Sequence, residues 1–249
     1  MSPRFAQPSD LLGHPRLGEH EVGRRVIGTL AVLSLLAVLV AWWHHEASSS
    51  KPAPNSLASV RLAGPRGPGC IRLIIGNDVS GSMTAFATAR SGALSEIRDW
   101  ARQNLRSDDQ IGVLDFAVNA GWEATPDGGS EGPPASVVHD GMDTDLDPVV
   151  DLVGQLPASS CETALVLLSD AQLADLPRTA DDGRGLLRGQ TISDVFLLVP
   201  GSAIQVPRQW TTAFPEAAPL RFDGTDPRAT GLAIGKVVAA LTRQTLKHV

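Results

Sequence analysis

The sequence has little of what nucleic-acid-binding proteins use. Its 27 acidic residues outnumber its 21 basic ones, and the formal net charge is −6, so no broad basic surface is expected. Tyrosine is absent and aromatic residues make up only 4% of the chain, which leaves few side chains on which bases could stack. DNA and RNA are therefore not expected as partners.

Ligands and loops for several other chemistries are also missing. The two cysteines, Cys70 and Cys161, have no second cysteine or histidine at a short ligand spacing, so a zinc site is not expected. No Walker-type phosphate loop occurs, and Ser80 lacks the Gly-x-Ser-x-Gly elbow of α/β-hydrolases. The sequence thus gives no sign of nucleotide hydrolysis or of a serine hydrolase.

The chain does have the composition and pattern of a folded α/β domain. Hydrophobic residues make up 43% of its 249 residues, which suffices for a real core. From Ile71 onward, strand-like apolar runs alternate with amphipathic helical stretches, which is typical of a doubly wound, mostly parallel sheet with helices on both faces. Strands are expected at 71–75, 111–118, 135–138, 163–169, 193–199 and 220–222, and helices at 83–105, 147–156 and 226–248. Asp147 is expected to cap the second helix, with Pro148 at its first position.

An uncharged stretch near the N-terminus predicts a membrane anchor. Val26–Trp43 has the length needed to cross about 30 Å of hydrocarbon. Arg24 and Arg25 precede it, whereas the first basic residue after it is Lys51, so the N-terminus is expected on the cytoplasmic side. A single-pass protein of the cell membrane with an extracytoplasmic domain follows. The alternative is a signal peptide cleaved near Ala47-Ser48-Ser49.

These observations divide the chain into four parts. Pro, Gly and charged residues without periodicity predict a disordered tail at the start, and a Ser- and Pro-rich segment predicts a tether after the anchor. The expected parts are a cytoplasmic tail (1–23), a transmembrane anchor (24–45), a linker (46–68) and the α/β domain (69–249).

A run of oxygen-bearing side chains follows the first expected strand of the domain. In Asp78-Val79-Ser80-Gly81-Ser82-Met83, a carboxylate and two hydroxyls alternate within a tight turn. Magnesium and similar ions take oxygen ligands in octahedral array, so the turn predicts a metal site. The alternative is that Asp78 and the serines only cap the following helix.

The Asp-x-Ser-x-Ser run resembles the metal-ion-dependent adhesion site (MIDAS) of the von Willebrand factor A family. Thr144 lies in Gly141–Leu146, similar to the family's Gly-x-x-Thr-x-Leu loop, and Asp170 ends a run similar to its fourth strand. The resemblance implies that Ser80 and Ser82 bind the metal directly, that Thr144 joins in one conformational state, and that Asp78 and Asp170 often act through water. It implies Mg²⁺, with Mn²⁺ or Ca²⁺ as alternatives. In one departure from the commoner pattern, Ala171 stands where the family often has Gly.

The resemblance also bears on the cysteines, because in this family the first and fourth strands are parallel neighbours. Cys70 lies eight residues before Asp78 and Cys161 nine before Asp170, so a disulfide at the opposite end of the sheet is expected. Such a bond needs an oxidising compartment, which agrees with an extracytoplasmic domain. The alternative is two unrelated buried thiols.

The leading hypothesis is a protein-binding module whose metal accepts an Asp or Glu carboxylate from a partner. One alternative is an assembly subunit of an envelope complex in which the metal only stabilises the fold. The other is a metal-dependent hydrolase, for which His139 is the one histidine near the site in sequence. The acidic residues around Thr144 could form a calcium site or a solvated loop; they are Asp140, Asp143, Asp145 and Asp147.

Overall fold

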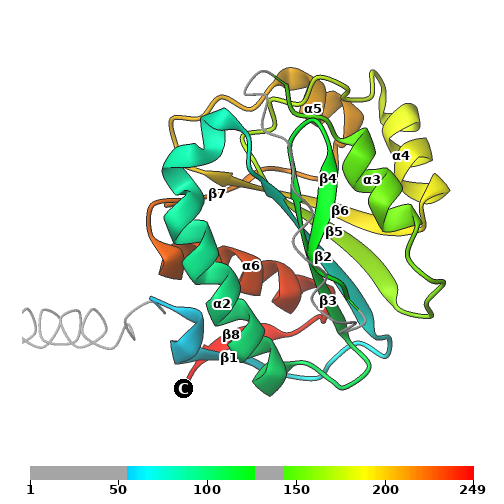
Figure 1. The fold of residues 1–249 in the computed structure, drawn as a ribbon. Helices are drawn as coiled ribbons and strands as arrows, with labels where there is room; N and C mark the ends of the chain where they lie inside the picture. The colour runs from blue at the N-terminus through cyan, green and yellow to red at the C-terminus, as the bar shows by residue number, and fades with distance from the viewer. Residues whose placement is uncertain (1–54, 127–142) are drawn as a thin grey trace, which may run out of the picture. The chain divides into compact units, whose positions relative to one another are not determined.

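Six strands form a central sheet, in the order β4-β3-β2-β5-β6-β7 (Figure 1). The computed structural model describes residues 55–126 and 143–249. All neighbouring strands of this sheet are parallel except β3 and β4, so the expected α/β fold with a mostly parallel sheet is confirmed. The strands are β2 (Ile71–Asp78), β3 (Gln110–Phe116), β4 (Ala120–Ala124), β5 (Glu162–Leu168), β6 (Ile192–Pro200) and β7 (Leu220–Phe222).

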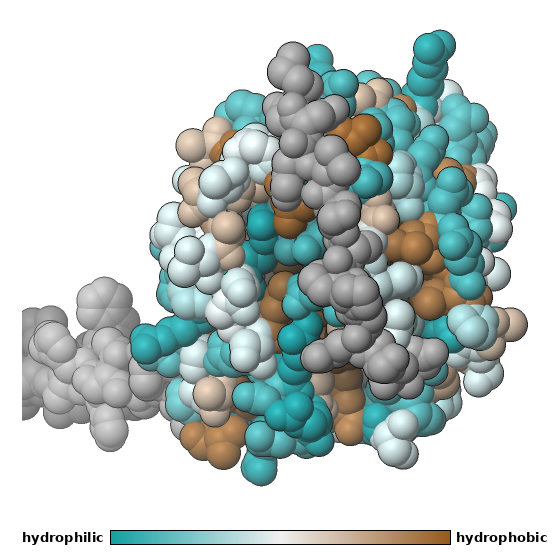
Figure 2. All heavy atoms as spheres, viewed as in Figure 1, coloured by the Kyte–Doolittle hydropathy of each residue, from teal (hydrophilic) through white to brown (hydrophobic). Residues whose placement is uncertain are grey.

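Helices cover both faces of the sheet, and each face has its own apolar core. The eight residues of β2 are all buried, as expected for a central parallel strand; Ile74 joins one core, and Leu73 and Ile75 join the other. One face carries α2 (Ala87–Asn104) and α6 (Pro227–Leu241), and the other carries α3 (Asp147–Gly154), α4 (Ala180–Gly189) and α5 (Arg208–Ala213). On the surface seen in Figure 2, hydrophobic residues form separate patches between hydrophilic ones.

The first helix begins differently from the expectation. Gly81–Phe86 forms a 3₁₀ helix, η2, and the α-helix starts only at Ala87. Helix α4 is not expected from the sequence, and its ten residues include Gly183, Gly185 and Gly189. Glycine weakens a helix, so the local signal for α4 is poor.

The closing helix is shorter than expected and a strand follows it. It ends at Leu241 and not at His248, and Thr245–His248 forms β8, which pairs antiparallel with β1 (Val60–Ala63). Arg243 has a φ of 57°, and the amide of Gln244 donates to the carbonyl of Ala239 at 2.8 Å, which is a left-handed helix stop. Glycine usually takes that position, so an arginine there gave no sequence signal for the stop.

The last part of the predicted linker, 46–68, belongs to the folded unit, so the domain boundary expected at residue 69 is too late. Leu57–Ser59 forms a short 3₁₀ helix, η1, and Leu57 is fully buried. The indole nitrogen of Trp100 donates to the carbonyl oxygen of Val60 at 2.8 Å. Residues from Pro54 to Val249 form one compact unit.

The other N-terminal predictions lie outside the described residues. They are the tail 1–23, the anchor 24–45 and the start of the linker; the expected strand 135–138 and His139 lie outside as well. Within 55–126 and 143–249, no helix has both the length and the apolar character needed to span a bilayer.

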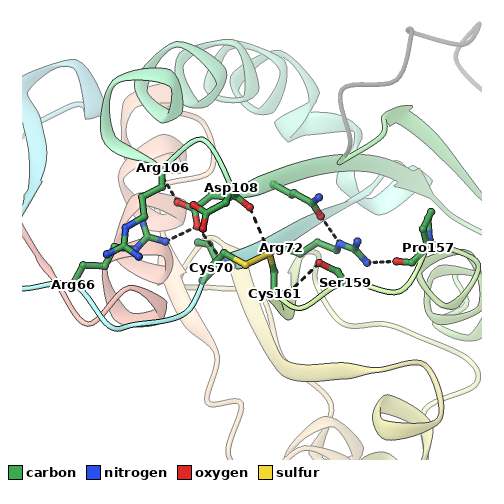
Figure 3. Close-up of a disulfide and its surroundings, with 11 residues drawn as sticks. Arg66, Cys70, Arg72, Arg106, Asp108, Pro157, Ser159 and Cys161 are labelled. Carbon is green, nitrogen blue, oxygen red and sulfur yellow. Dashed lines mark hydrogen bonds and ion pairs between the residues drawn. A yellow bond between two sulfur atoms is a disulfide. The ribbon is translucent and has the colours of Figure 1, made fainter.

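A disulfide joins Cys70 and Cys161 where β2 and β5 begin (Figure 3). Ile71 pairs with Glu162 in the parallel ladder, so the two cysteines stand opposite each other, with their Cα atoms 4.7 Å apart. The predicted cysteine pair is thus present as a bond. Beside it, Arg66 pairs with Asp109 at 2.5 Å, and both side chains are almost completely buried.

Candidate metal site

The segments that carry the predicted ligands meet where the parallel strands end, opposite the disulfide. The amide of Val79, just after β2, donates to the carbonyl of Phe116 at 2.9 Å. The amide of Asp145 donates to the carbonyl of Ala117, and the amide of Ala174 donates to the carbonyl of Thr144, both at 2.9 Å. The loops that carry the predicted ligands are therefore held together at the carboxyl ends of the strands, where α/β sheets bind ligands.

Asp78 is completely buried and held from two sides. Its Oδ1 accepts a hydrogen bond from the Ser80 amide at 2.9 Å, and its Oδ2 accepts one from the Ser169 hydroxyl at 2.5 Å. The guanidinium of Arg90, itself buried, donates to the backbone carbonyl of Asp78 at 2.6 Å. Both the carboxylate and its peptide group are thus fixed by hydrogen bonds from the protein itself.

The ionised form of Asp78 is disfavoured in the protein alone. Burial raises the pKa of this carboxyl group; the hydrogen bonds from Ser169 and Ser80 oppose the shift, and the charge of nearby Asp170 adds to it. Burial also lowers the pKa of Arg90. A cation beside Asp78 and Asp170 would offset both the lost hydration and the mutual repulsion of the two carboxylates.

The two serine hydroxyls lie close enough to share one ion. Ser80 Oγ and Ser82 Oγ are 3.2 Å apart, and Ser82 is exposed whereas Ser80 is nearly buried. Neighbouring oxygen ligands of an octahedral Mg²⁺ are about 3 Å apart, since each metal–oxygen bond is about 2.1 Å. Ser80 precedes η2 but its side chain makes no capping hydrogen bond, so the capping alternative fails for this hydroxyl.

Thr144 is buried in the loop that leads into α3. Asp147 does not cap this helix as expected, because Leu146 holds the cap position and Asp147 is already helical. The carboxylate of Asp175 accepts the Leu146 and Asp147 amides instead, both at 2.7 Å. Asp175 therefore fixes the loop that carries Thr144, and no local sequence pattern pointed to it.

Asp170 follows β5 and is 8% exposed. One of its carboxylate oxygens accepts the amide of Gln172 at 3.0 Å. The next residue, Ala171, has a φ of 61°, which explains why glycine suits this position. The hydroxyl oxygen of Ser169 accepts the Ala171 amide at 2.9 Å, so Ser169 supports both Asp78 and the turn at Asp170.

The site would rely on few acidic side chains. In the two described ranges, no group of three or more His, Cys, Asp or Glu residues could hold a metal ion. The predicted set has two carboxylates and three hydroxyls, so the oxygen donors fit a hard divalent ion without neutralising it in full if the carboxylates act through water. Of the acidic residues around Thr144, Asp143 and Asp147 are exposed, and Asp140 lies outside the described residues.

The comparisons with known proteins bear on the fold. No family model and no curated protein matches the chain. Two structures of proximal thread matrix protein 1 from the mussel byssus match with TM-scores of 0.51 and 0.50, at 11% and 16% identity. They cover 74% and 72% of this chain and 49% and 48% of the mussel chain, so this chain spans about half the length of the structures it matches.

Two further solved structures match less well. A third structure of the mussel protein, with zinc in its MIDAS motif, has a TM-score of 0.48 at 15% identity and covers 72% of this chain and 47% of the other. The ArnB paralog VWA2 from Sulfolobus acidocaldarius has a TM-score of 0.43 at 19% identity, covering 67% and 44%. At such identities, the likeness to the mussel protein shows the fold alone.

Proposed function

We propose that the chain is a membrane-anchored module of the von Willebrand factor A type that binds a partner protein through a divalent metal ion. Asp78, Ser80, Ser82, Thr144 and Asp170 would hold the ion, with Mg²⁺ expected and Mn²⁺ or Ca²⁺ as alternatives. An Asp or Glu of the partner would fill an open coordination position. The main support is Asp78, a fully buried carboxylate beside a second carboxylate at the ligand-binding edge of the sheet.

The charge of the site favours an acidic partner. An ion held largely by neutral hydroxyls keeps positive charge, and a partner carboxylate can offset that charge directly. Ser82 is exposed, so the site opens to solvent on the side of η2. The arrangement thus suits binding better than hydrolysis, which would need a base such as His139. Catalysis and a purely stabilising metal remain the two alternatives.

The Cys70–Cys161 disulfide favours an oxidising compartment, which agrees with a domain displayed outside the cytoplasmic membrane by the predicted anchor 24–45.

Titration calorimetry of the full-length chain with MgCl₂ and MnCl₂ tests the metal site. Asp78→Ala should lower the affinity at least a hundredfold, because it removes one of the two carboxylates of the proposed site. The matched control is Asp99→Ala, which removes an exposed carboxylate on α2. Equal affinities of the Asp78→Ala and wild-type chains would contradict the proposal.

Binding of small carboxylates separates a partner site from a purely stabilising metal. With Mn²⁺ bound, acetate should displace a coordinated water and lower the relaxation rate of water protons, whereas acetamide should not. If metal raises the melting temperature but acetate leaves the relaxation rate unchanged, the stabilising role is favoured.

A further inference from the structure

The outer edge of β6 is largely open. On one side, β6 pairs with β5 from Ile192 to Leu198; on the other side, β7 covers only Leu198–Pro200. Within the described residues, no strand pairs with Ser193–Leu197 on the side of β7. Since successive residues of a strand direct their amide and carbonyl groups to opposite sides, at least two residues of this stretch offer a donor and an acceptor to that edge.

A hollow runs along the open edge. It has a volume of about 280 Å³ and lies between Ser193–Phe196 of β6 and the Ala213–Ala217 segment that leads toward β7. The chain after α5 is tied to that helix, because the indole nitrogen of Trp210 donates to the carbonyl of Ala217 at 2.9 Å. This volume is near the lower limit of ligand pockets, so the hollow fits a short stretch of extended chain and not a folded domain.

The charges beside the hollow indicate which kind of side chain a bound segment would carry. Asp194 and Glu216 line it, and both are exposed. Partial burial raises the pKa of the Asp194 carboxyl group, and the nearby charges of Glu162 and Glu216 raise it further. Arg184 and Arg188 also line the hollow; Arg184 pairs with Asp181 at 2.5 Å, and neither arginine is among the charges that shift the pKa of Asp194. A cationic side chain from a ligand would relieve the repulsion among the three carboxylates.

We infer that the open edge of β6 is a second binding surface, which accepts an extended, lysine- or arginine-bearing segment of a partner protein as an added strand. The backbone of the segment would pair with Ser193–Leu197, and every second side chain would reach the face of Asp194. This surface lies at the amino-terminal half of β6, whereas the metal site lies at the carboxyl ends of the strands. It would therefore work without metal.

Hydrogen exchange and affinity measurements on the full-length chain, in chelator, test the inference. The probe is a short synthetic peptide of alternating lysine and valine, compared with an alternating glutamate and valine peptide. The lysine peptide should slow exchange in Ser193–Leu197 and bind at least tenfold more tightly than the glutamate peptide. Methylation of every second backbone nitrogen of the lysine peptide should abolish its binding, because it removes the donors for strand pairing.

Charge reversal on the protein gives a second readout. Asp194→Lys should weaken binding of the lysine peptide about tenfold, whereas Asp99→Lys, on the other face of the sheet, should not. If Asp194→Lys does not fold, Glu216→Lys takes its place. The inference is overturned if no lysine peptide binds, if backbone methylation has no effect, or if protection appears in the metal-site loops and not in β6.

Discussion

The central sheet has an amino-terminal edge, where its parallel strands begin, and a carboxyl-terminal edge, where they end, and the two differ in the charges that they bring together. At the amino-terminal edge, a disulfide, the buried Arg66–Asp109 pair and the hydrogen bonds of Arg72 hold the strands together (Figure 3). At the carboxyl-terminal edge, Asp78 and Asp170 bring two carboxylates together and Ala171 holds a left-handed backbone. One edge joins opposite charges, whereas the other holds two like charges close together, which is where the proposed ion would bind.

The largest effect is expected at the amino-terminal edge, from Asp109→Ala. Asp109 accepts hydrogen bonds from Arg66, from the Ile71 amide at 3.0 Å and from the Arg106 amide at 2.7 Å. Its loss leaves the guanidinium of Arg66 buried without its partner, so the free energy of unfolding should fall by about 3–5 kcal/mol. Urea denaturation measures it; a loss below about 1 kcal/mol would show that this pair adds little.

Removal of the disulfide should have the next largest effect. The Cys70→Ala/Cys161→Ala chain loses a bond that spans 91 residues, and the free energy of unfolding should fall by about 2–4 kcal/mol. Metal affinity of the folded protein should stay within about twofold, because the bond lies at the other edge. Denaturation and calorimetry on the same sample check both parts. A large drop in affinity would mean that the two edges are coupled.

Ser169→Ala tests the carboxyl-terminal edge. Without this hydroxyl, Asp78 loses the donor to its Oδ2 and the Ala171 amide loses its acceptor, so metal affinity should fall about tenfold. Ser169→Thr keeps the hydroxyl and should retain most of the affinity. If both variants bind metal as the wild type does, Ser169 does not position Asp78. Titration calorimetry with Mn²⁺ provides the comparison.

The smallest effect is a pH dependence of the metal-free protein. Because the pKa of Asp78 is raised above its ordinary value of 3.8, the native state binds more protons than the unfolded state. The contribution of Asp78 to stability is therefore full below 3.8 and is lost as the pH rises through the raised pKa. Asp78→Asn should flatten this part of the stability profile. Thermal unfolding in chelator across that range, for both proteins, measures the difference.

Much of the fold and the candidate ligands could be predicted from the sequence because their signals are local. The buried strand β2 is a continuous apolar run, and the Asp-x-Ser-x-Ser turn follows it directly. Groups that act over long sequence distances gave no such signal. Ser169 contacts Asp78 across 91 residues, and Asp175 holds the loop of Thr144 from 28 or 29 residues away.

The segments that form β1 and β8 were predicted wrongly for a related reason. The segment 57–63 is short and lies between two Pro-containing stretches, so it reads as part of a tether, yet Leu57 fills a space against Gly235 of α6 and the carbonyl of Val60 accepts a hydrogen bond from Trp100. Its strand β1 forms only because β8 arrives from the other end of the chain. Pairing between the first and last strands cannot be recognised from either segment alone.

If the chain is anchored on its N-terminal side and bound by a partner at the metal site, as proposed above, the disulfide has a mechanical consequence. Tension that enters through β1 reaches Cys70 before it reaches β2, and the bond to Cys161 passes part of it to β5. Those two strands end at Asp78 and at the residues just before Asp170. Force would thus arrive at both sides of the ion together, and the two halves of its cage would be stretched in parallel and not pulled apart.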